Sequence, residues 1–355
     1  MVSNNLLFFF ALILFSFFLN KYSFLILKKI NLKLLIDDQF EKPQAFHKSP
    51  IPLLGGVSIF LSFSLVYLYL FFFKNIVLYE YLTFCTLFFF LGFTEDLRIN
   101  LKPKIRLFLM IFLLILLVKY HNFYIKSTGI ELLDNWIMNS NFFALFFVCL
   151  CFLFVVNGAN LIDGYNGLLS IHSLIILINL FFINYLTKNY DLAILLFSGI
   201  LILLIFLKFN FPNAKSFLGD GGAYFLGIFL AISVIKTSIA NPTISPFFFC
   251  ILLFYLFFEV FFSFLRKLIV EKKSPIYPDN KHLHMILYKI LCKKNNSTWK
   301  SNYQVSIVIN LIYLILIIPA ILMMNNGLFC KYYSLLFFIT YIFSYKIAVN
   351  KKTLQ

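Results

Sequence analysis

The sequence predicts an all-α polytopic membrane protein, on the basis of its composition, the length of its apolar runs and the placement of its acids. Of 355 residues, 62% are hydrophobic and 12% are charged, and the mean hydropathy is +0.92. Apolar runs of about 17–25 residues recur along the chain, which is the length that a helix needs to cross a bilayer. Of fourteen Asp and Glu residues, only Glu259 lies clearly inside such a run.

About eleven spans are expected, and the basic residues between them predict an orientation. The connections assigned to the cytoplasm carry 23 of the 30 Lys and Arg residues, the opposite side carries 6, and Lys21 lies within the first span. By the positive-inside rule, the N-terminus is outside and the C-terminus is cytoplasmic. The expected spans are 6–27, 51–73, 77–93, 105–118, 142–156, 167–186, 192–207, 223–235, 246–265, 303–323 and 328–345.

The organisation that follows is a single transmembrane domain over residues 1–355, with a cytoplasmic loop at about 266–302 that is too short for an independent fold. The first run has neither a basic leading region nor a small-residue cleavage site, so we expect a span and not a cleaved signal peptide. The formal charge of +16 is distributed as the orientation requires, so we expect contact with anionic lipid headgroups and no nucleic-acid partner.

Four polar islands interrupt the apolar sequence, all on the expected cytoplasmic side. The densest is Asn157-x-x-Asn160-x-x-Asp163-Gly164-x-Asn166-Gly167, between the fifth and sixth spans. Carboxylate and amide oxygens are the ligands of hard cations such as Mg²⁺, which keeps waters and phosphate oxygens as its other ligands. The alternative is a polar turn between helices with Asn caps.

Two further islands carry carboxylates. Phe217-Leu218-Gly219-Asp220-Gly221-Gly222 precedes the eighth span, where Asp220 could hold a metal or serve as a helix N-cap. Glu95 and Asp96 end the third span, and adjacent carboxylates can bind a metal or provide a general base. A solvated pair of acids is the simpler interpretation of Glu95 and Asp96 taken alone.

The fourth island is Pro278-Asp279-Asn280-Lys281-His282-Leu283-His284. Histidines at i and i+2 do not share a helical face, so we expect an extended or looped segment followed by an amphipathic turn. Protonated histidines beside Lys281 suit a diphosphate or sugar hydroxyls, whereas a purely structural role is the alternative. Nearer the amino end, a segment with His47 and Lys48 leads into the second span.

Taken together and in this order, the motifs resemble those of the polyprenyl-phosphate N-acetylhexosamine-1-phosphate transferases, a glycosyltransferase family 4 type. The resemblance covers about residues 42–285, and the Pro-Asp-x-x-His-x-His form resembles the N-acetylglucosamine-1-phosphate branch more than the phospho-N-acetylmuramoyl-pentapeptide branch. It implies Mg²⁺ as cofactor, with Mn²⁺ as an alternative, and a site on the cytoplasmic face of a bacterial inner membrane.

The resemblance assigns three kinds of role. The expected catalytic residues are Asp96, Glu95 and Asp163, and the expected metal ligands are Asp220 and Asn160. The expected substrate-binding residues are Asn157, Asn166, Asn210, His282, His284, Lys281, Arg266, His47 and Lys48.

Some positions depart from the family pattern. Glu95 and Glu259 stand where Asp is usual, Met285 where a third His is common, Asn280 where Arg is frequent, and Ala223 where Ser is frequent. Because the principal acids remain, we expect an active enzyme.

The expected reaction transfers a sugar-1-phosphate from a UDP-N-acetylhexosamine to a polyprenyl phosphate such as undecaprenyl phosphate, giving UMP and initiating cell-envelope glycan synthesis. The alternatives are a non-catalytic member of the family and a lipid-carrier transporter. The scarcity of acids inside the spans argues against a transporter, because ion-coupled transporters usually carry ionisable groups near mid-membrane. The resemblance also leaves a homodimer open.

Overall fold

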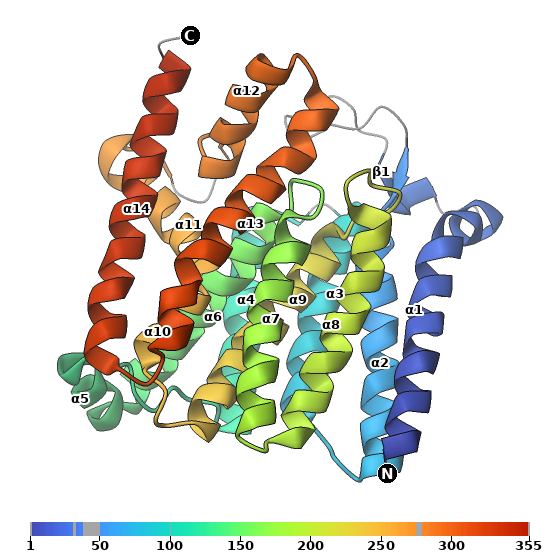
Figure 1. Ribbon diagram of the computed structural model, residues 1–355, viewed down its shortest axis with the longest axis horizontal. Helices are drawn as coiled ribbons and strands as arrows, with labels where there is room; N and C mark the ends of the chain where they lie inside the picture. Colours follow the sequence, from blue (N-terminus) through green and yellow to red (C-terminus); the bar gives the residue numbers. More distant parts are fainter. Residues whose placement is uncertain (1, 31–32, 38–49, 100, 275–278, 354–355) are drawn as a thin grey trace. The chain divides into compact units, whose positions relative to one another are not determined.

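The computed structural model describes residues 2–30, 33–37, 50–99, 101–274 and 279–353, and this part of the chain is almost entirely helical (Figure 1). One two-stranded antiparallel sheet pairs Ile36 with Pro52 and Asp37 with Ile51. Within the described residues the elements are α1 (Val2–Ile30), η1 (Lys33–Leu35), β1 (Ile36–Asp37), β2 (Ile51–Pro52), α2 (Gly55–Lys74), α3 (Tyr79–Asp96), α4 (Pro103–His121), α5 (Glu131–Asn139), α6 (Asn141–Ile162), α7 (Leu168–Leu186), α8 (Tyr190–Asn210), α9 (Gly219–Ala240), α10 (Pro246–Leu252), α11 (Phe254–Leu265), η2 (Arg266–Val270), α12 (Leu283–Asn295), α13 (Thr298–Leu322) and α14 (Gly327–Thr353).

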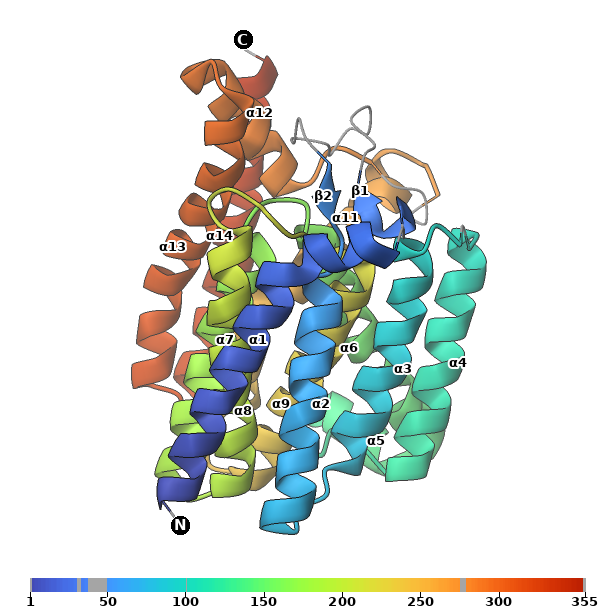
Figure 2. The same ribbon diagram turned by 90° about the vertical axis from the view of Figure 1, so that its right-hand side faces the viewer.

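The chain divides into two compact units. The first unit comprises residues 1–102 and 169–233, and the second comprises 103–168 and 234–355. In the first unit, α1, α2 and α8 pack against one another (Figure 2). Its core is aromatic: Phe63, Tyr81, Phe225 and Phe229 are fully buried, and the ring of Phe63 lies 4.6 Å from that of Phe229.

The second unit is built around the packing of α6 against α11 and of α12 against α13 and α14. Gly158 lets α6 and α11 approach closely, because a Cβ at this position would collide with the backbone carbonyl of Leu256. Serine side chains cap the amino ends of α6 and α13. Ser140 accepts a hydrogen bond from the N–H of Phe143 at 3.2 Å, and Ser297 accepts one from the N–H of Lys300 at 3.3 Å.

Each of the eleven expected spans contains helix in the structure, although the one expected at 51–73 begins with the two residues of β2. Eight described helices are long and apolar enough to cross a membrane, or nine if the bent pair α10 and α11 is one span. Neither α3 nor α4 is among them, because α3 contains Glu80, Glu95 and Asp96 and α4 contains Lys104, Arg106 and Lys119. The multi-pass character is therefore clear, while the number eleven and the orientation stay predictions.

Two features of the helices differ from the expected pattern. The expected span 246–265 is broken at Leu253, where the axes of the two helical parts differ by 76°. The hydroxyl of Tyr313 donates to the carbonyl of Leu252 at 2.6 Å and so satisfies a backbone group next to the break. The short helix α5, which has one strongly apolar face, lies in a connection where no helix was expected.

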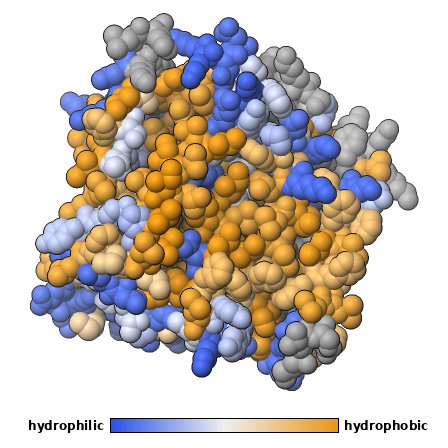
Figure 3. Space-filling model, viewed as in Figure 1, coloured by the Kyte–Doolittle hydropathy of each residue, from blue (hydrophilic) through white to orange (hydrophobic). Residues whose placement is uncertain are grey.

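The surface of α13 and α14 agrees with a membrane location. Exposed positions on α13 include Leu311 and Ile315, and those on α14 include Leu335 and Ile339. Figure 3 shows hydrophobic side chains over this part of the molecule. Exposed apolar side chains on long helices are expected where lipid tails replace water.

Candidate functional site

In the first unit, the Asp96 side chain contacts the amino end of α9. Its Oδ1 accepts a hydrogen bond from the backbone N–H of Asp220 at 2.8 Å, and its Oδ2 accepts one from Gly221 at 2.9 Å. The first N–H groups of a helix have no partner within the helix, and its amino end carries a partial positive charge, so a carboxylate there is stabilised. The last residue of α3 thereby fixes the second residue of α9.

Glycines allow this close approach. Gly219 has a φ of +76°, and a Cβ at this position would lie 2.7 Å from the Asp96 carboxylate. On the other side of the turn, Gly56 donates its N–H to the carbonyl of Leu218 at 2.8 Å, and a Cβ on Gly56 would lie 2.5 Å from the nitrogen of Gly222. Side chains at either position would displace the turn that carries Asp220.

The electrostatics at Asp96 are unusual for a carboxylate. Burial raises its pKa to about 7, with a further contribution from the charge of Asp220, even though the bonds from Gly221 and Asp220 act in the opposite direction. Asp96 is 7% exposed, whereas Glu95 and Asp220 are both partly exposed. The structure thus brings Glu95, Asp96 and Asp220 together. Asp96 is buried and anchors the turn, whereas Glu95 and Asp220 are more accessible.

The amide of Asn210 also has a structural contact in the first unit. Its Nδ2 donates to the carbonyl of Ser216 at 3.0 Å, so Asn210, the last residue of α8, helps to close the connection to the Asp220 turn. This bond gives Asn210 a structural role in addition to its predicted role in substrate binding.

In the second unit, two of the predicted asparagines lie within a helix instead of a loop. Helix α6 continues to Ile162, so Asn157 and Asn160 occupy its last turns, and Asp163 is its C-cap. Asn157 donates from Nδ2 to the carbonyl of Leu153 at 2.8 Å, and the Asp163 N–H contacts the carbonyl of Asn160 at 3.3 Å. The spacing of three residues places Asn157, Asn160 and Asp163 on neighbouring parts of one helical face.

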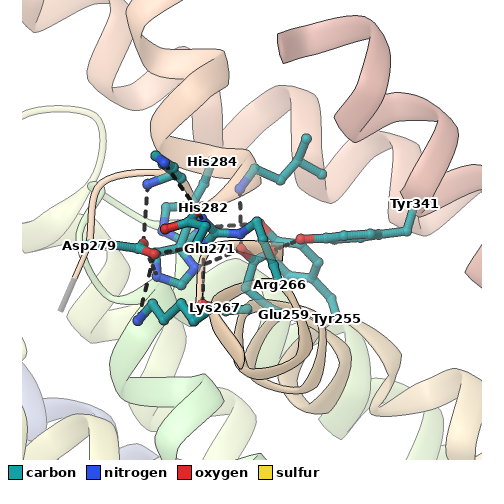
Figure 4. A network of polar contacts seen from close by, with 12 residues as sticks. Tyr255, Glu259, Arg266, Lys267, Glu271, Asp279, His282, His284 and Tyr341 are labelled. Carbon is teal, nitrogen blue, oxygen red and sulfur yellow. Dashed lines mark hydrogen bonds and ion pairs between the residues drawn. The ribbon is translucent and has the colours of Figure 1, made fainter. Parts of the chain in front are cut away.

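The segment that carries His282 and His284, residues 279–284, is called the histidine segment. It is organised around the buried Glu259 of α11 (Figure 4). This carboxylate is 1% exposed; its Oε1 lies 3.0 Å from Nδ1 of His282 and accepts the N–H of Leu283 at 3.2 Å. Its Oε2 accepts the hydroxyl of Tyr341 in α14 at 2.6 Å. A buried charge needs such partners, and here they join α11, α12 and α14.

Ion pairs hold the rest of this segment. Arg266 lies 2.7 Å from Glu271 and 2.8 Å from Asp279, and Lys281 lies 3.0 Å from the same Glu271 oxygen. Asp279 also lies 3.2 Å from Nε2 of His282. Burial raises the pKa of Asp279, but neighbouring His282, the Lys281 N–H and Arg266 outweigh burial and hold this pKa below its usual range.

The two predicted histidines differ in their environment. His282 is extended and precedes α12, whereas His284 lies in its first turn, and the two rings stack with centroids 5.5 Å apart. Nδ1 of His284 lies 3.2 Å from the hydroxyl of Tyr255. Burial lowers the pKa of His284 to about 4, so its ring is neutral at pH 7. Its Nε2 has no hydrogen-bond partner among the described residues.

His47 and Lys48 lie outside the described residues. In the described part of the chain no three His, Cys, Asp or Glu residues form a group that could hold a metal ion. Asp220 belongs to the first unit, whereas Asn160, Asp163, Asn166, Arg266, Lys281, His282 and His284 belong to the second.

The sequence did not identify several residues that shape these sites. Glu259 stood out as an acid within an apolar run, but neither its partner Tyr341 nor Tyr255, the partner of His284, gave a signal among 20 tyrosines. Asn302 accepts the backbone N–H of Asn166 at 2.9 Å. A signal for Asn302 was available, since Asn302, Ser306 and Asn310 repeat every four residues along an apolar helix.

Comparison with known proteins gives consistent results. A family model described as glycosyl transferase family 4 matches residues 78–238. An undecaprenyl-phosphate alpha-N-acetylglucosaminyl 1-phosphate transferase from Thermotoga maritima is 28% identical over 72% of this chain and 72% of its own length. A phospho-N-acetylmuramoyl-pentapeptide-transferase from Prochlorococcus marinus is 30% identical over 84% of this chain and 88% of its own, and one from Dictyoglomus turgidum is 32% identical over 65% and 75%.

Proposed function

The chain belongs to glycosyl transferase family 4, and we propose that it transfers N-acetylhexosamine-1-phosphate from a UDP-sugar to a polyprenyl phosphate, with undecaprenyl phosphate as the expected acceptor. An oxygen of the acceptor phosphate attacks the phosphorus that carries the sugar. The bond from that phosphorus to UMP breaks, and UMP leaves with the bridging oxygen. The lipid product is a polyprenyl-diphosphate-sugar that begins a cell-envelope glycan.

The observation that carries this proposal is the contact of Asp96 with the amino end of α9. Two hydrogen bonds and the glycine at position 219 hold Asp220 in one place, while its side chain is only partly buried. A fixed, accessible carboxylate beside two further acids suits a reaction between two phosphates, because these anions repel one another until their charge is neutralised.

A divalent cation suits the carboxylate oxygens of Asp220 and the amide oxygen of Asn160. Mg²⁺ is usually held by one or two carboxylates together with waters and substrate phosphates, so it does not require a cluster of three acids. We propose Asp220 as its principal ligand and Asn160 as a second, with Mn²⁺ as a substitute. The chemistry that the metal supplies when bound is neutralisation of the diphosphate and polarisation of the attacked phosphorus.

We propose that the remaining predicted residues of these two units contact the two substrates. Asp96 and Glu95 act at the acceptor phosphate, and Asp163 acts with Asn157, Asn166 and Asn210 at the nucleotide-sugar. Each oxygen of an ionised carboxylate has two lone pairs, so the two bonds that Asp96 accepts leave acceptor capacity.

The histidine segment supplies a second set of contacts with the donor. Arg266 and Lys281 contribute positive charge near its diphosphate from positions that Glu271 and Asp279 hold. His284 contributes the neutral ring nitrogen Nε2, and His282 supports the segment through Glu259. His47 and Lys48 keep their proposed role at the substrate.

The proposed topology has eleven spans, an outside N-terminus and a site at the cytoplasmic face of the bacterial inner membrane. The excess of Lys and Arg on one side supports it. We extend the proposal to a single transmembrane domain, because the helices α7 and α9 each contain residues of both compact units.

The donor is proposed to be a UDP-N-acetylhexosamine, N-acetylglucosamine first. The Thermotoga relative and the Pro-Asp-x-x-His-x-His form support this choice, whereas the Prochlorococcus and Dictyoglomus relatives favour the larger muramoyl-pentapeptide donor. The test is UMP release by membranes containing the protein, with Mg²⁺, undecaprenyl phosphate and one UDP-sugar at a time. Release of UMP with only one of the UDP-sugars identifies the sugar that the protein transfers. No release with any donor, from folded protein, favours a non-catalytic member or a lipid-carrier transporter.

A further inference from the structure

Three polar side chains on α13 hold the loop that follows α6. Asn302 Oδ1 accepts the backbone N–H of Asn166 at 2.9 Å, and Ser306 Oγ donates to the carbonyl of Asn166 at 2.7 Å. Asn310 Nδ2 donates to the carbonyl of Leu168 at 3.1 Å. All these residues belong to the second unit. We call Asn302, Ser306 and Asn310 the α13 clamp.

The α13 clamp places three buried polar side chains in an apolar helix, which costs free energy unless they are hydrogen-bonded. Its residues are 4%, 0% and 3% exposed and lie in a helix that is otherwise apolar enough to span a membrane. Polar groups buried in such a helix must find partners, because neither lipid nor water can satisfy them there. The partners include backbone atoms of Asn166 and Leu168, so the clamp fixes the path of the chain between α6 and α7.

The loop is anchored at both ends and open between them. At its start the Asp163 N–H contacts the Asn160 carbonyl, and at its end Gly167, with φ +78°, leads into the clamped Leu168. Around Gly164, a Cβ would meet no atom within 4 Å among the described residues. The loop is thus fixed on the side of α13 and has room at Gly164, as a ligand-binding loop requires.

We propose that Asn302, Ser306 and Asn310 are positioning residues for the sugar-nucleotide donor: by holding the backbone at Asn166 and Leu168 they orient Asp163 and Asn166. The inference rests on the proposed function, because it assigns these two side chains to the donor. It adds residues outside the matched region 78–238. A displacement of about 1 Å in a positioning element can lower a rate about 100-fold.

The test compares Ser306→Ala with Ser306→Thr, which retains the hydroxyl, and with Tyr313→Phe as the matched control. Tyr313 is also buried in α13 and also donates to a backbone carbonyl, but its partner is Leu252 in α10. Ser306→Ala should raise KM for the UDP-sugar about tenfold or more without changing KM for undecaprenyl phosphate. Ser306→Thr should restore it, and Tyr313→Phe should leave both constants unchanged.

Hydrogen exchange gives a readout that does not depend on activity. The amides of a peptide covering residues 163–168 should exchange faster in Ser306→Ala than in wild type or Tyr313→Phe. If Ser306→Ala does not fold, Asn302→Asp, which keeps the acceptor, and Asn302→Leu, which removes it, carry the same comparison.

Two results separate the failure of this inference from the failure of the proposed function. Active protein in which Ser306→Ala and Tyr313→Phe behave alike, in kinetics and in exchange, overturns the α13 clamp. Wild-type protein that exchanges slowly at 163–168, with faster exchange in Ser306→Ala, but that releases no UMP from any donor, retains the clamp as a structural feature and overturns its role at the donor.

Discussion

The carboxylate of Asp96 and the backbone N–H of Asp220 are joined by a hydrogen bond of 2.8 Å, and Gly221 donates a second bond to the other carboxylate oxygen. These contacts connect residues 124 and 125 positions apart in the chain. They place the first turn of α9 against the end of α3 and thereby determine where the Asp220 side chain is held.

An Asp96→Asn variant tests this contact. The substitution keeps the size of the side chain but turns an NH₂ group toward a backbone N–H, so one buried donor loses its acceptor. A loss of about 1–3 kcal/mol is expected, with a lower Tm in detergent and at least a tenfold lower turnover. Asp134→Asn is the control, because Asp134 also accepts bonds from Thr128 and Ser127 in the second unit. It should lower Tm without lowering turnover, and unchanged Tm in Asp96→Asn would contradict the account.

A Gly219→Ala variant tests the backbone of the same turn. The left-handed conformation at φ +76° costs a non-glycine residue about 1–2 kcal/mol, and the added Cβ would contact Asp96. We expect a lower Tm together with a large loss of UMP release. Gly327→Ala is the matched control at the first residue of α14, where a Cβ meets nothing within 4 Å among the described residues. Equal effects of the two substitutions would refute the proposed constraint.

Tyr341→Phe tests the connection between α14 and the histidine segment. Removal of the hydroxyl leaves Oε2 of the buried Glu259 without this donor, which should cost about 1–3 kcal/mol. The segment that Glu259 anchors should then be cut faster by trypsin after Lys281. Tyr333→Phe, earlier on α14, is the control, since the hydroxyl of Tyr333 donates to the carbonyl of Leu316 in α13 at 2.8 Å. Identical cleavage rates in both variants would show that Glu259 does not anchor the segment.

The pKa of Asp279 predicts a pH dependence of stability. This pKa lies below the ordinary value of 3.8, so the ionised form is bound more tightly in the folded state. Its stabilising contribution is therefore fully present above about pH 5 and is lost as the pH falls through the folded pKa, below about pH 4. The difference in Tm between wild type and Asp279→Asn should shrink as the pH falls from about 5 to below about 4. A difference that grows on acidification has the wrong sign for this ion pair.

Apolar run length predicted the helices well, because a segment that must satisfy its own backbone in lipid has helix as its simplest solution. The break at Leu253 was not predictable: no Pro or Gly marks it, and the Tyr313 hydroxyl that satisfies Leu252 lies 61 residues away. The helix α5 was missed because its nine residues are too few to stand out in a window set for spans.

The candidate residues were predictable as types and less so as arrangements. The spacing Asn157-x-x-Asn160-x-x-Asp163 does not reveal that α6 continues to Ile162. Likewise, the acid pair 95–96 gives no indication that Asp96 contacts the backbone of residues 220 and 221, since that contact depends on glycines at 219 and 92. Contacts of this kind depend on long-range packing, which neither periodicity nor spacing encodes.

The most direct test of the central claim is the release of UMP by wild type, Asp220→Asn and Asp191→Asn, each with undecaprenyl phosphate, the preferred UDP-sugar and Mg²⁺. Asp191 is the matched control, because it is an acid in the first turn of another helix of the same unit, α8. The account predicts Mg²⁺-dependent release by wild type and by Asp191→Asn, and a loss of about 100-fold or more in Asp220→Asn. Wild-type release from a folded Asp220→Asn protein would contradict it.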